Sequence, residues 1–295
     1  MGDIPPLRLV FSGGGIRVVA HAGALQVLEK RGFLRTVKEY VGVSAGALIA
    51  LCLVIGYTPD MMSQFCVSFD FSLIRSIEPE AVFEFMETLG FDTGEKLRSL
   101  VRSILRQRGL GPTTTFADLR RIYPQAPRLR IFASDIFTCT PREFNETETP
   151  QVDLITAVMA SMCIPGYFVP VRDPITNHML VDGGALQNFP LAFLTEEEQK
   201  TSLGLTFSED HTRVDDIETP FALFQQIYAC FYLPRTLELW KHNKRRIIII
   251  PCGDFPMWDF EASSDVRREL IEKGAAAARE FTCKGTKPLR RYSVS

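Results

Sequence analysis

The chain has 295 residues, of which 46% are hydrophobic, and a formal net charge of -2. This composition is typical of a globular protein with enough chain to bury a substantial core. The near-neutral charge balance gives no electrostatic reason to expect nucleic acid as a partner. The seven cysteines are dispersed and form no C-x-x-C pair, which favours reduced thiols in a cytoplasmic protein and argues against a disulfide framework or a zinc site.

The N-terminal part of the chain alternates strand and helix signals. A β-rich apolar run at residues 7–11 ends in a glycine turn, and residues 16–28 then carry apolar side chains at helical spacing. A second strand is expected at residues 39–43 and a second helix at residues 45–55. Strand, glycine turn, helix, strand, tight turn and helix in this order are typical of a parallel α/β sheet.

The rest of the chain adds helices and further strands. Residues 60–125 are expected to be mainly helical, and no repeat or linker divides the sequence. We therefore expect a single domain over residues 1–283, followed by a basic tail at residues 284–295. Further strands are predicted at residues 129–133, 179–181, 202–207 and 247–250, and a last helix over residues 264–281.

A G-x-S-x-G motif, Gly42-Val-Ser44-Ala-Gly46, lies between the second strand and the second helix. Glycines on either side allow a strained strand-to-helix turn that exposes the serine hydroxyl. The helix that follows points the positive end of its dipole toward charge that develops at the serine. In this setting the motif favours a nucleophilic serine over a plain tight turn.

The glycine turn after the first strand, Gly13-Gly14-Gly15 with Arg17, forms a second candidate element. Backbone N–H groups in such a turn can approach an anion closely. A dinucleotide site is disfavoured because Val18 replaces the third glycine of G-x-G-x-x-G, and a Walker loop is excluded by the missing G-K-[ST]. An oxyanion hole is the favoured interpretation, and a turn that only lets the helix pack is the alternative.

The partner of Ser44 is less apparent from the residues alone. None of the four histidines has a context that marks it as a base, whereas Asp182 ends a strand and is followed by Gly183-Gly184. An aspartate at the end of a strand is well placed to face a site at the edge of the sheet. A free Asp has a pKa of about 3.9, so we expect burial to raise the pKa of Asp182.

Taken in order, these three motifs resemble the patatin-like phospholipases, and the resemblance covers about residues 7–190. It implies a three-layer α/β/α sandwich with a mostly parallel central sheet. It also implies hydrolysis of acyl esters in lipids by a Ser44–Asp182 dyad, with amides of the glycine loop holding the oxyanion. The chain departs from the family pattern at Val18, where members usually have glycine. Ala160-Ser161 and Asn188 with Pro190 are supporting matches.

The sequence therefore predicts a cytoplasmic, phospholipase A-like hydrolase that uses no metal or other cofactor. Its expected partner is a phospholipid or another acyl-ester lipid. Transient membrane contact is a hypothesis based on the aromatic-rich residues 221–233 and on basic residues at 241–246 and in the tail. Two alternatives stay open. One is an α/β-hydrolase-type esterase with a triad that uses His211 or His242, and the other is a vestigial lipid-binding module.

Overall fold

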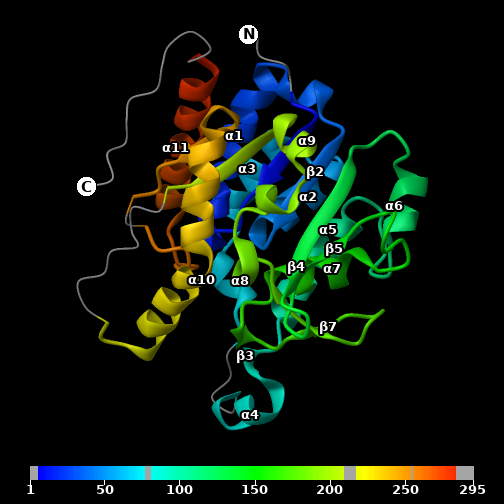
Figure 1. Ribbon diagram of the computed structural model, residues 1–295, viewed down its shortest axis with the longest axis vertical. Coiled ribbons are helices and arrows are strands. Elements are labelled where there is room, and N and C mark those ends of the chain that lie inside the picture. The colour runs from blue at the N-terminus through cyan, green and yellow to red at the C-terminus, as the bar shows by residue number, and fades with distance from the viewer. Residues whose placement is uncertain (1–5, 77–80, 209–216, 254, 284–295) are drawn as a thin grey trace.

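The computed structural model describes residues 6–76, 81–208, 217–253 and 255–283. The predicted tail at 284–295 and His211 lie outside these residues. A central sheet of eight strands has the order β10-β9-β1-β2-β4-β8-β7, and β5 pairs with β4 (Figure 1). The five parallel strands are β1 (Arg8–Phe11), β2 (Glu39–Val43), β4 (Arg128–Asp135), β9 (Ser202–Phe207) and β10 (Ile247–Ile250). The antiparallel strands are β5 (Thr140–Phe144), β7 (Val171–Arg172) and β8 (Met179–Asp182).

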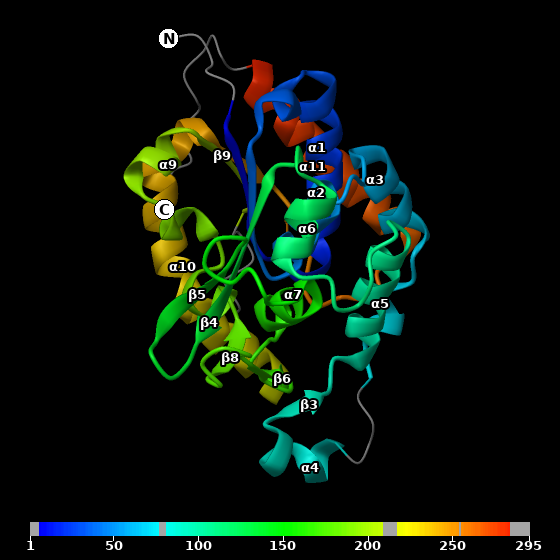
Figure 2. The ribbon, with the colours of Figure 1, turned by 90° about the vertical axis from the view of Figure 1, so that its right-hand side faces the viewer.

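Buried side chains alternate between the two faces of the sheet, as the period of a strand requires. Leu9 and Phe11 of β1 lie in the main core, whereas Val10 between them lies in a smaller core on the opposite face. Both faces are buried, so the central strands read as continuous apolar runs. Helices cover both faces, which confirms the predicted three-layer α/β/α arrangement (Figure 2).

The two helical layers differ in size. The main core is covered by α1 (Val19–Lys30), α2 (Ala45–Val54), α3 (Pro59–Ser68), α5 (Glu95–Arg106), α6 (Phe116–Ile122), α7 (Leu154–Met162) and α11 (Ser264–Cys283). The thinner layer contains α8 (Gly184–Gln187), the short helix η4 (Pro190–Phe193), α9 (Glu196–Lys200) and α10 (Pro220–Asn243). A further helix, α4 (Ala81–Thr88), lies at the lower end of the molecule in both views.

The strands predicted at residues 7–11, 39–43, 129–133, 179–181, 202–207 and 247–250 correspond to β1, β2, β4, β8, β9 and β10. The small sheet of β3 (Gly90–Asp92) and β6 (Gly166–Phe168) was not expected in the mainly helical region. Strands of two or three residues carry too little alternation to be recognised. Helix α10 also continues through Pro234, although proline usually ends or kinks a helix.

The neighbours of β4 bring the candidate residues together. Residues 131–135 of β4 pair with β5 along one edge, so β2 and β8 must share the other edge. β2 ends with Val43 opposite Phe132, and β8, which runs the opposite way, ends with Asp182 opposite Ala133. Ser44 and Asp182 therefore follow one another along the same edge of β4. This head-to-head meeting of two strands places the serine beside the carboxylate.

Candidate active site

Ser44 occupies a strained turn between β2 and α2. Its φ of 54° and ψ of -133° lie outside the regions that residues with a side chain prefer. A Cβ at Gly42 would lie 2.4 Å from the Gly46 carbonyl oxygen, and one at Gly46 would lie 2.5 Å from the Ser12 carbonyl oxygen. The turn is thus too tight for side chains at the two predicted glycines, and it packs directly on the loop after β1.

The buried hydroxyl of Ser161 holds the turn that carries Ser44 in place. Ser161, near the end of α7, accepts a hydrogen bond from the Ser44 amide at 2.8 Å and donates one to the Phe132 carbonyl at 2.6 Å. Ser161 is fully buried, so each of these bonds satisfies a backbone group that water cannot reach. Ser161 therefore positions Ser44 and ties the turn to β4.

Asp182 lies in direct contact with the serine hydroxyl. Ser44 Oγ donates to Asp182 Oδ2 at 2.6 Å, and the Gly184 amide donates to Asp182 Oδ1 at 2.7 Å. Burial raises the pKa of Asp182 from 3.8 to about 6, because desolvation disfavours the ionised form more than these hydrogen bonds favour it. The carboxylate is therefore a stronger base than an ordinary aspartate. Gly183, the other predicted supporting residue, leaves room for the carbonyl oxygen of Phe132, 2.4 Å from where its Cβ would stand.

The glycine loop after β1 lies against the serine. A Cβ at Gly13 would come within 2.9 Å of the Ser44 Cβ. The Gly13 amide, however, donates to the Asn188 carbonyl at 3.0 Å, so it is not directed at an oxyanion. No group in the described part of the chain accepts a hydrogen bond from the amides of Gly14 or Gly15. Of the three predicted glycines, these two remain the candidates for an oxyanion hole.

The Arg17 side chain contacts the segment that precedes α11. It is buried, and both Nε and Nη2 donate to the carbonyl oxygen of Phe255. This contact anchors the loop to the segment before α11, and a role of Arg17 among the oxyanion groups stays a prediction. Val18 has φ -56° and ψ -21°, which any residue adopts, so the departure from the family glycine causes no backbone strain.

Tyr228 is a site residue that the sequence did not single out. It lies on the buried side of α10, and its hydroxyl is 3.4 Å from Asp182 Oδ1. This contact favours the ionised carboxylate and so lowers the pKa of Asp182, against the effect of burial. In the sequence Tyr228 is one aromatic residue among several, and nothing local distinguishes it from a packing residue.

The described histidines make other contacts. His21 is buried in α1, where desolvation lowers its pKa to about 3, and it stacks on Phe207. His178 pairs with Asp135 at 2.8 Å, and the exposed His242 pairs with Glu238 at 2.9 Å. None of the three has a hydrogen bond to Ser44.

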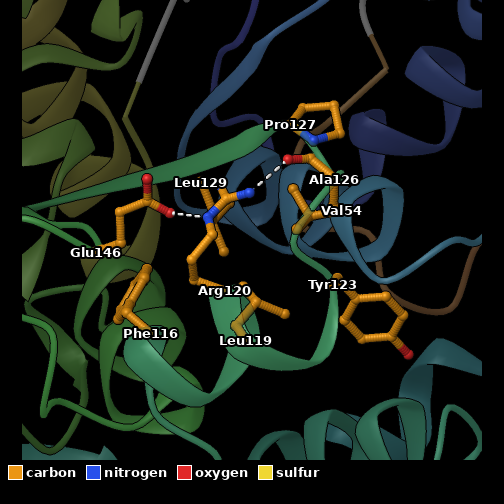
Figure 3. Close-up of a pocket in the computed structure, with 9 residues that line it drawn as sticks. All are labelled: Val54, Phe116, Leu119, Arg120, Tyr123, Ala126, Pro127, Leu129 and Glu146. Atoms are coloured by element: carbon orange, nitrogen blue, oxygen red, sulfur yellow. Dashed lines mark hydrogen bonds and ion pairs between the residues drawn. The ribbon is translucent and has the colours of Figure 1, made fainter.

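Two hollows differ in their relation to this site. The hollow in Figure 3 has a volume of about 10 Å³ and contains the Arg120–Glu146 ion pair at 2.7 Å. It lies beside Leu129 at the start of β4, at the end of the sheet opposite Ser44, and its volume is about that of one water molecule. A hollow of about 310 Å³ lies closer, because Cys163 lines it and the carbonyl of Cys163 accepts the Asp182 amide at 2.6 Å.

Within the described ranges, no group of three or more His, Cys, Asp or Glu side chains is arranged to hold a metal ion. No helix in that part of the chain combines the length and the hydropathy needed to cross a membrane. None of the seven cysteines forms a disulfide bond.

A three-layer α/β fold with a serine on a strand-to-helix turn, next to a buried aspartate and a glycine loop, defines a class of serine–aspartate proteins. The family model described as patatin-like phospholipase matches residues 9–195, which is more than half of the chain. The chain belongs to the patatin-like phospholipase family, as its motifs predict. Membership of this family supports lipid hydrolase activity.

Known relatives extend the similarity beyond the motifs. The uncharacterized protein YqhO of Bacillus subtilis is 28% identical over 283 residues, which are 90% of this chain and 94% of YqhO. The probable lipid hydrolase 463L of Invertebrate iridescent virus 6 is 26% identical and is matched over 62% of this chain and 61% of its own length. Among solved structures, VipD from Legionella pneumophila has a TM-score of 0.64 at 16% identity, with 96% of this chain and 67% of VipD covered. This last similarity confirms the fold alone.

Proposed function

We propose that this protein is a lipid acyl hydrolase of the phospholipase A type, in which Ser44 is the nucleophile and Asp182 its base. The observation that carries the proposal is the 2.6 Å hydrogen bond from Ser44 Oγ to the buried Asp182 carboxylate. Membership of the patatin-like phospholipase family supports a lipid ester as the substrate. The raised pKa of Asp182 supports its role as a base, because general bases work best when their pKa lies near the working pH.

In the first half of the reaction, Ser44 Oγ attacks the ester carbonyl carbon while its proton passes to Asp182. The carbonyl electrons move onto oxygen, and this oxyanion is stabilised by the Gly14 and Gly15 amides and by the N-terminus of α2. The bond to the leaving alcohol then breaks, and Asp182 returns the proton to the alcohol oxygen. The acyl group is left as an ester on Ser44.

In the second half, water takes the place of the alcohol. Asp182 accepts a proton from the water as its oxygen attacks the acyl carbon, and the same amides hold the second oxyanion. Collapse of this intermediate breaks the bond to Ser44 Oγ, which recovers its proton from Asp182. The products are a free fatty acid and the unmodified enzyme.

A fluorophosphonate probe tests the nucleophile, because it reacts with activated serines. We expect the parent to be labelled and Ser44→Ala to be unlabelled at the same thermal unfolding midpoint. Incubation with a mixed lipid extract, followed by mass spectrometry, should give free fatty acids and lysolipids with the parent only. Labelling that persists in Ser44→Ala would show that Ser44 is not the reactive serine. A folded parent without labelling or product would favour the lipid-binding module.

The esterase with a Ser-Asp-His triad makes a different prediction. A triad requires a histidine whose replacement abolishes turnover, and His211 lies outside the described residues. We expect His211→Ala and His242→Ala to retain turnover, because the carboxylate already contacts the serine hydroxyl directly. Loss of turnover in either folded variant would establish the triad instead.

A further inference from the structure

Most of the large apolar side chains that are exposed in the described residues fall into three groups. Phe83 and Met86 of α4 are 86% and 82% exposed. Phe137, in the turn between β4 and β5, and Ile175, in the turn between β7 and β8, are also exposed. The third group is a stripe on α10. In both views, which differ by a rotation about the vertical axis, α4 and the first half of α10 lie in the lower part of the molecule, and Figure 1 shows β7 there as well (Figures 1 and 2).

The two turns form one connected tip just beyond Asp182. β8 runs from this tip to the aspartate, and the Ile136 amide donates to the Met179 carbonyl at 3.3 Å. Phe137 stacks on His178, with ring centroids 5.0 Å apart. The tip is therefore held together by contacts between the two hairpins. Phe137 and Ile175 are exposed on a surface that these contacts order.

Helix α10 has an inner and an outer side that differ in what they contact. Tyr228, Ala229 and Tyr232 are buried together in a small cluster against α8, and Tyr228 reaches Asp182. Leu223, Ile227 and Phe231 are exposed and spaced by four residues, so they form a stripe along one side of the helix. No charged residue occurs between Glu218 and Arg235. Exposed apolar side chains that are grouped in this way mark a surface for an apolar partner.

The hollow of about 310 Å³ is lined by Thr93, just after β3, by Arg172 of β7 and by Cys163, whose carbonyl accepts the Asp182 amide. The tip and α10 both belong to elements that contact the candidate dyad, because β8 carries Asp182 and Tyr228 of α10 reaches it.

We propose that this end of the molecule docks on a lipid bilayer through an apolar rim made of Phe137, Ile175, Leu223, Ile227 and Phe231. The proposal rests on the proposed function, because a lipid substrate is what makes the bilayer the fitting partner for an apolar surface at the dyad. Because this segment of α10 carries no charged residue, we expect it to bind the bilayer by inserting apolar side chains rather than by attraction between charges. The basic residue Lys241 lies in the last turn of α10, at the opposite end from the stripe, and Arg245 lies in the short helix η6 (Lys244–Arg246) that follows.

Flotation with phosphatidylcholine vesicles tests the rim. The variants are made in a Ser44→Ala background, so that binding is measured without hydrolysis. We expect Ile227→Ser/Phe231→Ser and Phe137→Ser/Ile175→Ser each to lower the partition coefficient at least about tenfold, because large apolar side chains dominate interfacial binding. The control pair Met61→Ser/Ile122→Ser removes apolar side chains of similar exposure, 41% and 44%, from α3 and α6. We expect it to bind like the parent.

A gain of signal separates docking from misfolding. Phe231→Trp should be quenched by lipids brominated in their acyl chains, and Ile122→Trp should not. If the rim variants and the control variant have equal partition coefficients, or if the parent does not bind the vesicles, the proposed docking through the rim is wrong. Binding that is lost at high salt and in Lys241→Gln/Arg245→Gln would place the contact at the other end of α10 and overturn it too. A parent dimer that the rim substitutions dissociate would make the surface an interface between copies.

These outcomes are independent of the proposed chemistry. Fluorophosphonate labelling and product formation by the form with Ser44 intact test the hydrolase. A labelled enzyme whose rim variants bind vesicles normally would refute the rim and leave the hydrolase standing. A parent that docks through the rim without labelling would refute the hydrolase alone.

Discussion

The buried carboxylate of Asp182 should make the stability of the protein depend on pH. Its pKa in the folded state is about 6, compared with an ordinary value of 3.8. The folded protein therefore binds more protons than the unfolded chain between these values, and stability falls as the pH rises from about 4 to about 6. A shift of this size corresponds to about 3 kcal/mol of unfolding free energy, lost once the carboxylate is ionised.

Asp182→Asn removes this dependence of stability on pH, because the side-chain amide does not ionise in this pH range. Near pH 4 the variant and the parent should differ only by the small effect of altered hydrogen bonds. Above about pH 6 the variant should gain about 3 kcal/mol relative to the parent, which is about 5 °C in the unfolding midpoint for a chain of this length. Turnover should fall at least about a hundredfold, since the base is gone.

Thermal unfolding followed by circular dichroism at a series of pH values measures the difference between the two proteins. Asp135→Asn is a matched control, because that carboxylate is paired with His178 and its pKa is lowered, mainly by the His178 hydrogen bond and the Phe137 amide acting against desolvation. It should lose stability at neutral pH rather than gain it. A midpoint difference for Asp182→Asn that stays constant from about pH 4 to about pH 8 would refute the reasoning, as would normal turnover.

Three further substitutions test how the site is built. Ser161→Ala leaves the Ser44 amide without its buried acceptor, so denaturant titration should show a loss of about 2 kcal/mol in the free energy of unfolding, together with reduced turnover. A loss of stability without any change in turnover would make Ser161 purely structural. Tyr228→Phe removes a hydroxyl that lowers the pKa of Asp182, so the rising limb of the pH–activity profile should move to higher pH; an unmoved limb would argue against the contact. Val18→Gly should keep turnover near the parent value and lose about 1 kcal/mol of stability in denaturant titration, because Val18 has an ordinary helical backbone; a large gain in turnover would show that the valine impairs the loop.

The local geometry around Ser44 could be predicted from the sequence because short-range sterics determine it. Two glycines around a serine, between an apolar strand and an apolar helix, have few conformations open to them. The turn has the strained backbone and close packing that this pattern indicates. The long strands and helices were predictable for the same reason, since their periodicity is written within each segment.

The position of Asp182 depended on the tertiary structure. The sequence indicated an aspartate at the end of a strand, and the expected sheet was mostly parallel. In the fold β8 is antiparallel to β4 and meets β2 end to end, which brings two residues 138 positions apart within 2.6 Å. No local pattern encodes such a meeting, because it depends on which edge of β4 is free beyond the end of β2.

The roles within the glycine loop were also decided by distant segments. The Asn188 carbonyl accepts a hydrogen bond from the Gly13 amide, and the Phe255 carbonyl accepts one from the Arg17 side chain. The hydroxyl of Tyr228, in α10, contacts the Asp182 carboxylate. The sequence by itself determined a serine on a strained turn, a glycine loop and the family to which they belong. The tertiary structure decided which amide of the glycine loop is hydrogen-bonded elsewhere and what surrounds the carboxylate, because hydrogen-bond partners and desolvation arise only when separate segments pack together.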